Sequence, residues 1–164
     1  ISKALDLHKP NPKDPLRVLS QIGGFEIAGI AGVILGAASR RIPVILDGFI
    51  SGASALVAHA LSPASIQYCI AGHVSFEAGH KAILEHLRLS PILNLEMRLG
   101  EGTGAALAMT LVEAAARMLT EMATFESAGV SKKLEENVFI KTILIIIVIF
   151  LVGKKKYLIK FNLT

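Results

Sequence analysis

Residues 42–75, IPVILDGFISGASALVAHALSPASIQYCIAGHVS, carry the pattern from which the fold is predicted. Two short apolar runs, 42–46 and 66–71, flank a segment with helical character, 51–61. Neither run alternates with polar residues, which is typical of strands buried on both faces. The order strand, helix, strand predicts an α/β fold with a parallel sheet covered by helices, of the Rossmann-like kind.

Two further helices are predicted before this unit. Asp14 and Pro15 supply an N-cap side chain and a first-turn proline, so a helix is expected to begin there and to end at the glycines 23–24. Residues 25–38 are apolar almost all round, which is typical of a helix buried between two layers.

After the central unit the alternation continues. A helix is expected from Ser75, with Ser75 as its N-cap. A third strand is expected at 92–97, and an Ala-rich helix at 105–122 follows the glycine-rich loop 100–104. In parallel sheets, ligands bind where the carboxyl ends of strands lead into helices. Three loops occupy such places, and they are residues 47–49, 72–75 and 100–104.

Each of these loops has a functional and a structural interpretation. Glu101, set among glycines, could perform chemistry or could only complement the helix dipole, which contributes about 0.3–1 kcal/mol. Ser75 and the free N–H groups of its loop could hold a phosphate or simply start a helix. Asp47 could bind a ligand or close a turn beside Gly48. The spacing alone leaves these alternatives open.

The composition argues against disorder and against nucleic-acid binding. Hydrophobic residues make up 52% of the chain, which is enough for a core. The net charge of +4 originates in residues 131–164, which hold seven Lys against Glu135 and Glu136. A basic face with aromatic residues is the footprint of nucleic-acid binding, and residues 1–130 carry none in their sequence. No nucleic-acid partner is therefore expected.

A metal site is not expected either. His73, Glu77 and His80 have a spacing that can share one helix face, but no second group of Cys or His residues supports them. Cys69 lies in an apolar run, where a buried and unreactive thiol is the ordinary interpretation.

Three longer segments resemble one enzyme family in their order and spacing. They are DPLRVLSQIGGFEIAGIAGVILGAASRRIPVILDGFISGASALVA (14–58), AGHVSFEAGHKAILEHL (71–87) and MRLGEGTGAALAMTLVEAAARMLTEMATFESAGV (97–130). They are similar to nicotinate-nucleotide:dimethylbenzimidazole phosphoribosyltransferases, and the resemblance covers roughly residues 4–130. Three linked motifs are more specific than a single glycine loop.

The resemblance implies a reaction and a set of site residues. A benzimidazole nitrogen would attack C1′ of nicotinate mononucleotide, displacing nicotinate and giving α-ribazole phosphate, with no redox cofactor and no metal. Glu101 matches the position of the family's general base. Leu99 would line the benzimidazole pocket. The other implied substrate-binding residues are Ser75, Asp47, Gly48, Gly100 and Gly102. The family resemblance also implies a homodimer.

The chain departs from the family at both ends. Family members are about twice as long, and their earlier half carries a glycine-rich phosphate loop that this sequence lacks. The chain begins at Ile1, and its first few residues, up to Leu7 and His8, look like the end of a helix whose beginning is lost, which indicates truncation. Residues 1–130 are therefore expected to form the C-terminal part of the family's α/β domain, and 131–164 a foreign apolar and Lys-rich tail.

The apolar tail and the N-terminal residues suggest where in the cell the protein is located. The apolar run 142–152, about eleven residues, is shorter than the roughly 20 that span a bilayer. No signal-peptide pattern opens the sequence, so a cytoplasmic protein is expected. The alternatives are an inactive fragment that only binds ligand, and a small membrane-associated protein held by residues 142–152.

Overall fold

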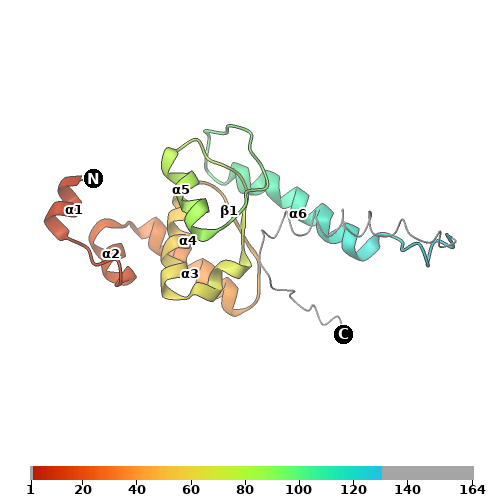
Figure 1. Ribbon diagram of the computed structural model, residues 1–164, viewed down its shortest axis with the longest axis horizontal. Helices are drawn as coiled ribbons and strands as arrows, with labels where there is room; N and C mark the ends of the chain where they lie inside the picture. The colour runs from red at the N-terminus through yellow and green to blue at the C-terminus, as the bar shows by residue number, and fades with distance from the viewer. Residues whose placement is uncertain (1, 131–164) are drawn as a thin grey trace.

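The computed structural model describes residues 2–130, and Figure 1 shows their arrangement. The described elements, in chain order, are α1 (Ser2–His8), α2 (Pro15–Ile22), α3 (Phe25–Ser39), β1 (Val44–Leu46), α4 (Phe49–Leu61), the 3-10 helix η1 (Pro63–Tyr68), β2 (Cys69–Ala71), α5 (Ala78–Leu87) and α6 (Thr103–Glu121). The predicted α/β fold is confirmed, with a small parallel sheet and helices around it. The tail prediction for residues 131–164 lies outside the described residues.

The sheet is built as the apolar runs predict, but it is shorter. β1 pairs in parallel with β2, with Val44 opposite Cys69 and Leu46 opposite Ala71. Of the third predicted strand, 92–97, only one parallel bridge forms, between His73 and Leu93. The strand prediction is wrong beyond that bridge because Glu96 has a positive φ of +52°, which interrupts extended backbone.

The second predicted strand also begins later than expected. Residues 63–68 form η1, with Pro63 in its first turn, so the strand starts at Cys69 rather than at 66. The Ser65 carbonyl accepts a bond from the Cys69 thiol at 3.7 Å. Burial raises the pKa of Cys69 to about 11, which fits the predicted unreactive thiol.

The start of α2 follows its capping residues. The Asp14 side chain accepts a hydrogen bond from the Arg17 N–H at 3.1 Å, and Pro15 occupies the first turn. The start of α5 does not follow the prediction. The helix begins at Ala78 with Glu77 at the N-cap position, and the Ser75 N–H donates to Nδ1 of His80 at 2.9 Å.

The core lies between α3, α4, α5, η1 and the sheet. Alanines on α4 let the neighbouring helix and strand approach closely, and the larger side chains of the other elements fill the remaining space. The core members include Ile34, Leu46, Ala55, Ala58, Ile66, Cys69, Ile83 and Leu87.

The prediction that α3 is buried between two layers is wrong for the described part of the chain. Ala31 and Ile34 face the core, but Phe25 is 96% exposed and Val33 is 64% exposed. The reason is that α4 and η1 cover one side of the helix only.

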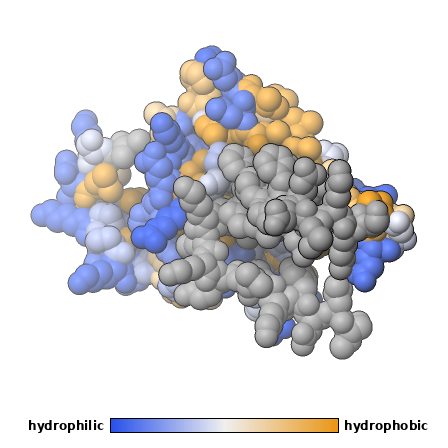
Figure 2. Space-filling view, turned by 45° about the vertical axis from the view of Figure 1, so that its right-hand side comes forward, coloured by the Kyte–Doolittle hydropathy of each residue, from blue (hydrophilic) through white to orange (hydrophobic). Residues whose placement is uncertain are grey.

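Helix α6 is also incompletely covered. It projects from the body as a long arm in Figure 1, and hydrophobic surface gathers in the upper part of Figure 2. The exposed large hydrophobic residues of α6 are Leu107, Met109, Leu111, Met118 and Leu119. Among residues 2–130, no helix has the length and apolar character needed to cross a bilayer.

Replacement of Ile34 tests the core. Ile34 is fully buried, so Ile34→Ala is expected to lower the free energy of unfolding by about 2–5 kcal/mol, measured by chemical denaturation. Val33→Ala on the same helix removes an exposed side chain and should change stability by less than about 1 kcal/mol. Equal effects of the two variants would contradict this assignment of the core.

Candidate active site

The three loops expected to form a site come together at the carboxyl end of the sheet. Asp47 directly follows β1, and its carboxylate reaches the start of α6. The Gly102 N–H donates to Oδ2 at 3.1 Å, and the Ala105 N–H donates to Oδ1 at 3.0 Å. The end of β1 is thus tied to a loop that lies 55 residues later in the chain.

Asp47 therefore has a role that neither sequence interpretation included. It was expected to bind a ligand or to close a turn beside Gly48, whereas its two oxygens cap the first turn of another helix. Its side chain is largely buried, with 17% exposed. A carboxylate at this place satisfies N–H groups that have no partner within the helix and complements the helix dipole.

The loop that carries Glu101 has an unusual backbone. Gly100, Glu101 and Gly102 all have positive φ, at +72°, +55° and +84°. Left-handed backbone costs a non-glycine residue about 1–3 kcal/mol and persists where the surroundings fix it. The Thr103 hydroxyl donates to the Gly100 carbonyl at 2.6 Å, which closes the loop on itself.

Glu101 is exposed in this loop, and Leu99, two residues before it, is 71% exposed. An exposed carboxylate in this place is free to meet a ligand from solvent. The structure thus brings Leu99, Gly100, Glu101 and Gly102 into one loop and joins that loop to Asp47.

Ser75 lies against the start of α4. A Cβ built on Gly48 would be 3.4 Å from the Ser75 Cβ and 3.5 Å from its hydroxyl oxygen. The prediction of free N–H groups in this loop is wrong at three positions: the Gly72 N–H donates to the Leu46 carbonyl, the Val74 N–H to the Leu93 carbonyl and the Ser75 N–H to His80. The Ser75 hydroxyl and the first turn of α4, which has no side-chain cap, remain available to an anion.

Two buried histidines lie beneath the site. His73 and His80 are each 1% exposed, and their ring centroids are 6.2 Å apart. Nδ1 of His73 lies 3.7 Å from Oδ1 of Asp47 and has no hydrogen-bond partner. Sequence reasoning considered these histidines only as metal ligands and missed their packing role.

The spacing argument for a shared helix face at His73, Glu77 and His80 is wrong because α5 begins at Ala78. Within residues 2–130, no three His, Cys, Asp or Glu side chains form a group that could hold a metal ion.

The glycines beside the histidines allow this close packing. A Cβ on Gly104 would collide with the His73 ring, so only glycine fits at the start of α6. A Cβ on Gly72 would lie 2.8 Å from the Leu46 carbonyl oxygen and 3.2 Å from the Ala105 Cα. The backbone of α6 therefore packs directly against the backbone at the end of the sheet, with no side chain between them.

A contact between Arg98 and Phe76 was also missed. The Arg98 guanidinium carbon lies 3.6 Å from the centroid of the Phe76 ring, a cation–π arrangement. Phe76 is 59% exposed, and the pair links the loop after β2 to the segment before Glu101.

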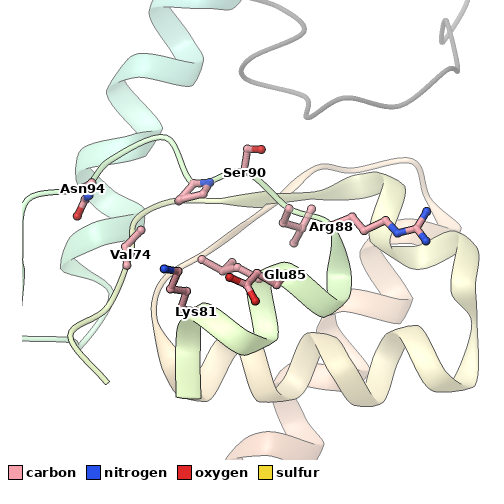
Figure 3. Close-up of a pocket in the computed structure, with 9 residues that line it drawn as sticks. Val74, Lys81, Glu85, Arg88, Ser90 and Asn94 are labelled. Carbon is pink, nitrogen blue, oxygen red and sulfur yellow. The ribbon is translucent and has the colours of Figure 1, made fainter. Parts of the chain in front are cut away.

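A cavity of about 440 Å³ lies beside these loops, between α5 and the segment that follows it (Figure 3). In Figure 3, Lys81 and Glu85 come from α5 and Arg88 extends away from them. The lining residues are Val74, Lys81, Leu84, Glu85, Arg88, Leu89, Ser90, Pro91 and Asn94. None of the predicted site residues lines it, but Val74 of loop 72–75 does, so the cavity adjoins the candidate site.

Comparisons with known proteins identify the relatives of this chain. A family model described as "Phosphoribosyltransferase" matches residues 1–130. A nicotinate-nucleotide–dimethylbenzimidazole phosphoribosyltransferase of Chloroflexus aggregans is 62% identical over 135 residues, which are 82% of this chain and 38% of the relative. The protein of the same name from Geobacter sp. strain M21 is 59% identical over 131 residues, 80% of this chain and 38% of the relative.

A solved structure gives the same result. The crystal structure of the phosphoribosyltransferase of this name from Thermus thermophilus matches with a TM-score of 0.74 and 46% identity. The match covers 80% of this chain and 39% of that structure. The chain thus spans about two fifths of the length of the relatives it matches.

Replacement of Gly104 tests the packing of α6 on His73. Gly104→Ala is expected to lower the free energy of unfolding by about 1–3 kcal/mol, because the added methyl group must displace the buried ring. The matched control is Gly36→Ala on α3, where a Cβ meets nothing within 4 Å. It should stabilise the protein by about 0.5–1 kcal/mol, since alanine favours a helix interior over glycine. Chemical denaturation measures both, and a neutral Gly104→Ala would refute the contact.

The buried His80 predicts a dependence of stability on pH. Burial lowers the pKa of His80, and the nearby His73 lowers it further, while Glu77 and Asp47 act in the opposite direction. The folded protein binds this proton more weakly than the unfolded chain, so the free energy of unfolding should fall as the pH drops below about 6.5. Protonation of Nδ1 would also break the bond from the Ser75 N–H.

His80→Gln should reduce this pH dependence between about pH 7.5 and 5, measured by denaturation at several pH values. The exposed His86 on the same helix supplies the control, because His86→Gln leaves the buried ring in place. An unchanged pH profile in His80→Gln would show that another group controls it.

Proposed function

The chain belongs to the phosphoribosyltransferase family whose relatives bear the name nicotinate-nucleotide–dimethylbenzimidazole phosphoribosyltransferase, and from this we propose that it contributes the catalytic base of that reaction. The proposed activity transfers phosphoribose from nicotinate mononucleotide to 5,6-dimethylbenzimidazole. The products are α-ribazole 5′-phosphate and nicotinate, and the reaction belongs to synthesis of the lower ligand of cobalamin.

The observation that carries the proposal is the place of Glu101. Its carboxylate is exposed, on a loop of three positive-φ residues, at the carboxyl end of a parallel sheet. Ligands bind at this edge in α/β folds. A carboxylate here is suited to accept a proton from the incoming base, and general-base assistance typically contributes about 10²–10⁴-fold to the rate.

The proposed step balances as a substitution at C1′ of the ribose. The unprotonated ring nitrogen of the benzimidazole attacks C1′ as the bond from C1′ to the nicotinate nitrogen breaks. The bonding electron pair leaves with nicotinate, whose pyridinium ring becomes neutral. Glu101 takes the proton from the other ring nitrogen, which removes the positive charge that the attack creates.

The other predicted residues are assigned by their places around Glu101. Leu99, exposed on the same loop, is proposed to contact the benzimidazole ring. Ser75 and Gly48 lie together at the start of α4, where a hydroxyl and backbone N–H groups suit the nucleotide phosphate. Gly100 and Gly102 complete the border of the proposed nucleotide site, and the Asp47 carboxylate lies beside them, where it accepts from the Gly102 N–H.

The proposed site depends on more protein than the described residues. The chain spans 38% of the length of its Chloroflexus relative, so the remainder of the nucleotide site is proposed to come from a further segment or another chain. The family match ends at residue 130, where we also place the domain boundary. A homodimer is proposed for the complete protein, with small-molecule substrates as its other partners.

Replacement of Glu101 tests this function. Residues 4–130 replace the matching segment of the Chloroflexus aggregans relative, and α-ribazole 5′-phosphate is measured by chromatography. Glu101→Gln removes the base with little change in shape, and a loss of about 10²–10⁴-fold in kcat is expected. The control, Glu121→Gln, changes an exposed glutamate at the far end of α6 and should keep the activity.

Equal rates of Glu101→Gln and the unmodified chimera would remove Glu101 from the mechanism. The 164-residue chain is assayed in parallel, and little or no turnover is expected from it alone. Robust turnover of that chain would show that the proposed dependence on further protein is wrong.

A further inference from the structure

We propose that Asp47 is a positioning residue for Glu101: it fixes the catalytic loop through hydrogen bonds to the start of α6 rather than by contact with substrate. This inference rests on the proposed function of Glu101. It replaces the assignment of Asp47 as a nucleotide contact with a different physical role, and the two roles have different kinetic consequences.

The geometry of the carboxylate carries the inference. Oδ2 of Asp47 accepts from the N–H of Gly102, the residue that directly follows Glu101, and Oδ1 accepts from the N–H of Ala105. Both oxygens are therefore engaged by the backbone of one loop and its helix. A rigid strand end thus holds the peptide next to the catalytic side chain.

The loop needs such a restraint. Glu101 has φ of +55°, a conformation that is unfavourable for a residue with a side chain, and its neighbours Gly100 and Gly102 are free to adopt many others. Without an external contact the loop would sample other backbone conformations. Asp47, which precedes Gly102 by 55 residues, makes two hydrogen bonds to this loop and the first turn of α6. These bonds restrict the backbone conformations that the loop can adopt.

The N-cap residue of α2, Asp14, can be compared with Asp47, because both carboxylates accept hydrogen bonds from backbone N–H groups at a helix start. Asp14 caps α2 with a single bond to the N–H of Arg17, three residues away, and it lies on the exposed surface. That bond is local and belongs to the helix itself. Asp47 makes two bonds across the fold and lies under the proposed site, so the same residue type has a local role in one place and a tertiary role in the other.

His73 restrains Asp47 from inside the protein. Its Nδ1 lies 3.7 Å from Oδ1, the oxygen that the Ala105 N–H also approaches, and its ring is 1% exposed. The ring fills the space that a Cβ of Gly104 would need. Movement of the carboxylate inward is therefore blocked by a buried side chain.

The inference predicts a change in kcat rather than in substrate affinity. Asp47→Asn keeps the size of the side chain but replaces one acceptor oxygen by an NH₂ group, which would face a backbone N–H. Displacement of a catalytic group by about 1 Å can cost about 10²-fold in rate. We expect kcat to fall about 10-fold to 100-fold, with KM for nicotinate mononucleotide unchanged within about twofold.

The closing experiment combines kinetics with amide exchange. In the chimera, kcat and KM are measured for Asp47→Asn, Glu101→Gln, the double variant and the control Asp14→Asn, which makes the same chemical change at the local cap. In the 164-residue chain, hydrogen exchange of the Gly102 and Ala105 amides is followed by NMR for Asp47→Asn and Asp14→Asn. Should Asp47→Asn fail to fold, Asp47→Glu keeps both oxygens but shifts them by one methylene.

The expected result is a fall in kcat for Asp47→Asn, faster exchange of the Gly102 and Ala105 amides, and normal behaviour of Asp14→Asn. The double variant should be no slower than Glu101→Gln alone, because Asp47 acts only through Glu101. For Asp47→Glu the same fall in kcat at constant KM is expected.

Three outcomes would overturn the inference: a rise in KM for nicotinate mononucleotide with little change in kcat, additive losses in the double variant, or unchanged exchange of both amides. If the unmodified chimera makes no product, the proposed function fails and this inference fails with it. If the chimera is active and Glu101→Gln is impaired, the function stands, and the Asp47 variants alone decide the inference.

Discussion

The hydrogen bonds between the Asp47 carboxylate and the start of α6 hold the site together, because they join the end of β1 to the loop that carries Glu101. A carboxylate is the natural partner for unpaired N–H groups at a helix start, so the same bonds stabilise α6 and fix the site. Small residues make them possible. Gly72 and Gly104 let the first turn of α6 lie against the end of the sheet, with the buried ring of His73 filling the space beneath.

The uncovered apolar surface fits a chain that spans only part of its relatives' length. Within residues 2–130, α3 and α6 are hydrophobic around much of their circumference, yet Phe25 and Leu119 remain largely exposed. Helices of this kind are normally buried on several sides. Among the described elements, α4 and η1 make the main contacts with α3, and they leave its other side uncovered.

Patterns along the chain were enough to predict the elements and the family. Continuous apolar runs predicted β1 and β2, Asp14 and Pro15 predicted the start of α2, and three linked motifs indicated the phosphoribosyltransferase family that the comparisons confirmed. These features are local, or fixed in order along the chain, so a pattern can identify them. The third strand was predicted correctly at only one residue pair, since the positive φ of Glu96 leaves no trace in a hydrophobic pattern.

The contacts that join the loops depend on the tertiary structure and could not be predicted from the sequence. Two of these contacts join segments that are far apart in the sequence: Asp47 caps α6, and the His73 ring packs against Gly104. A third joins Ser75 to His80. The sequence does not state how close any of these residues lie in space. A carboxylate followed by glycine has the same local pattern whether it closes a turn, binds a ligand or caps a distant helix. The choice among these roles depends on which unpaired N–H groups the fold brings within about 3 Å of it, and packing alone sets that.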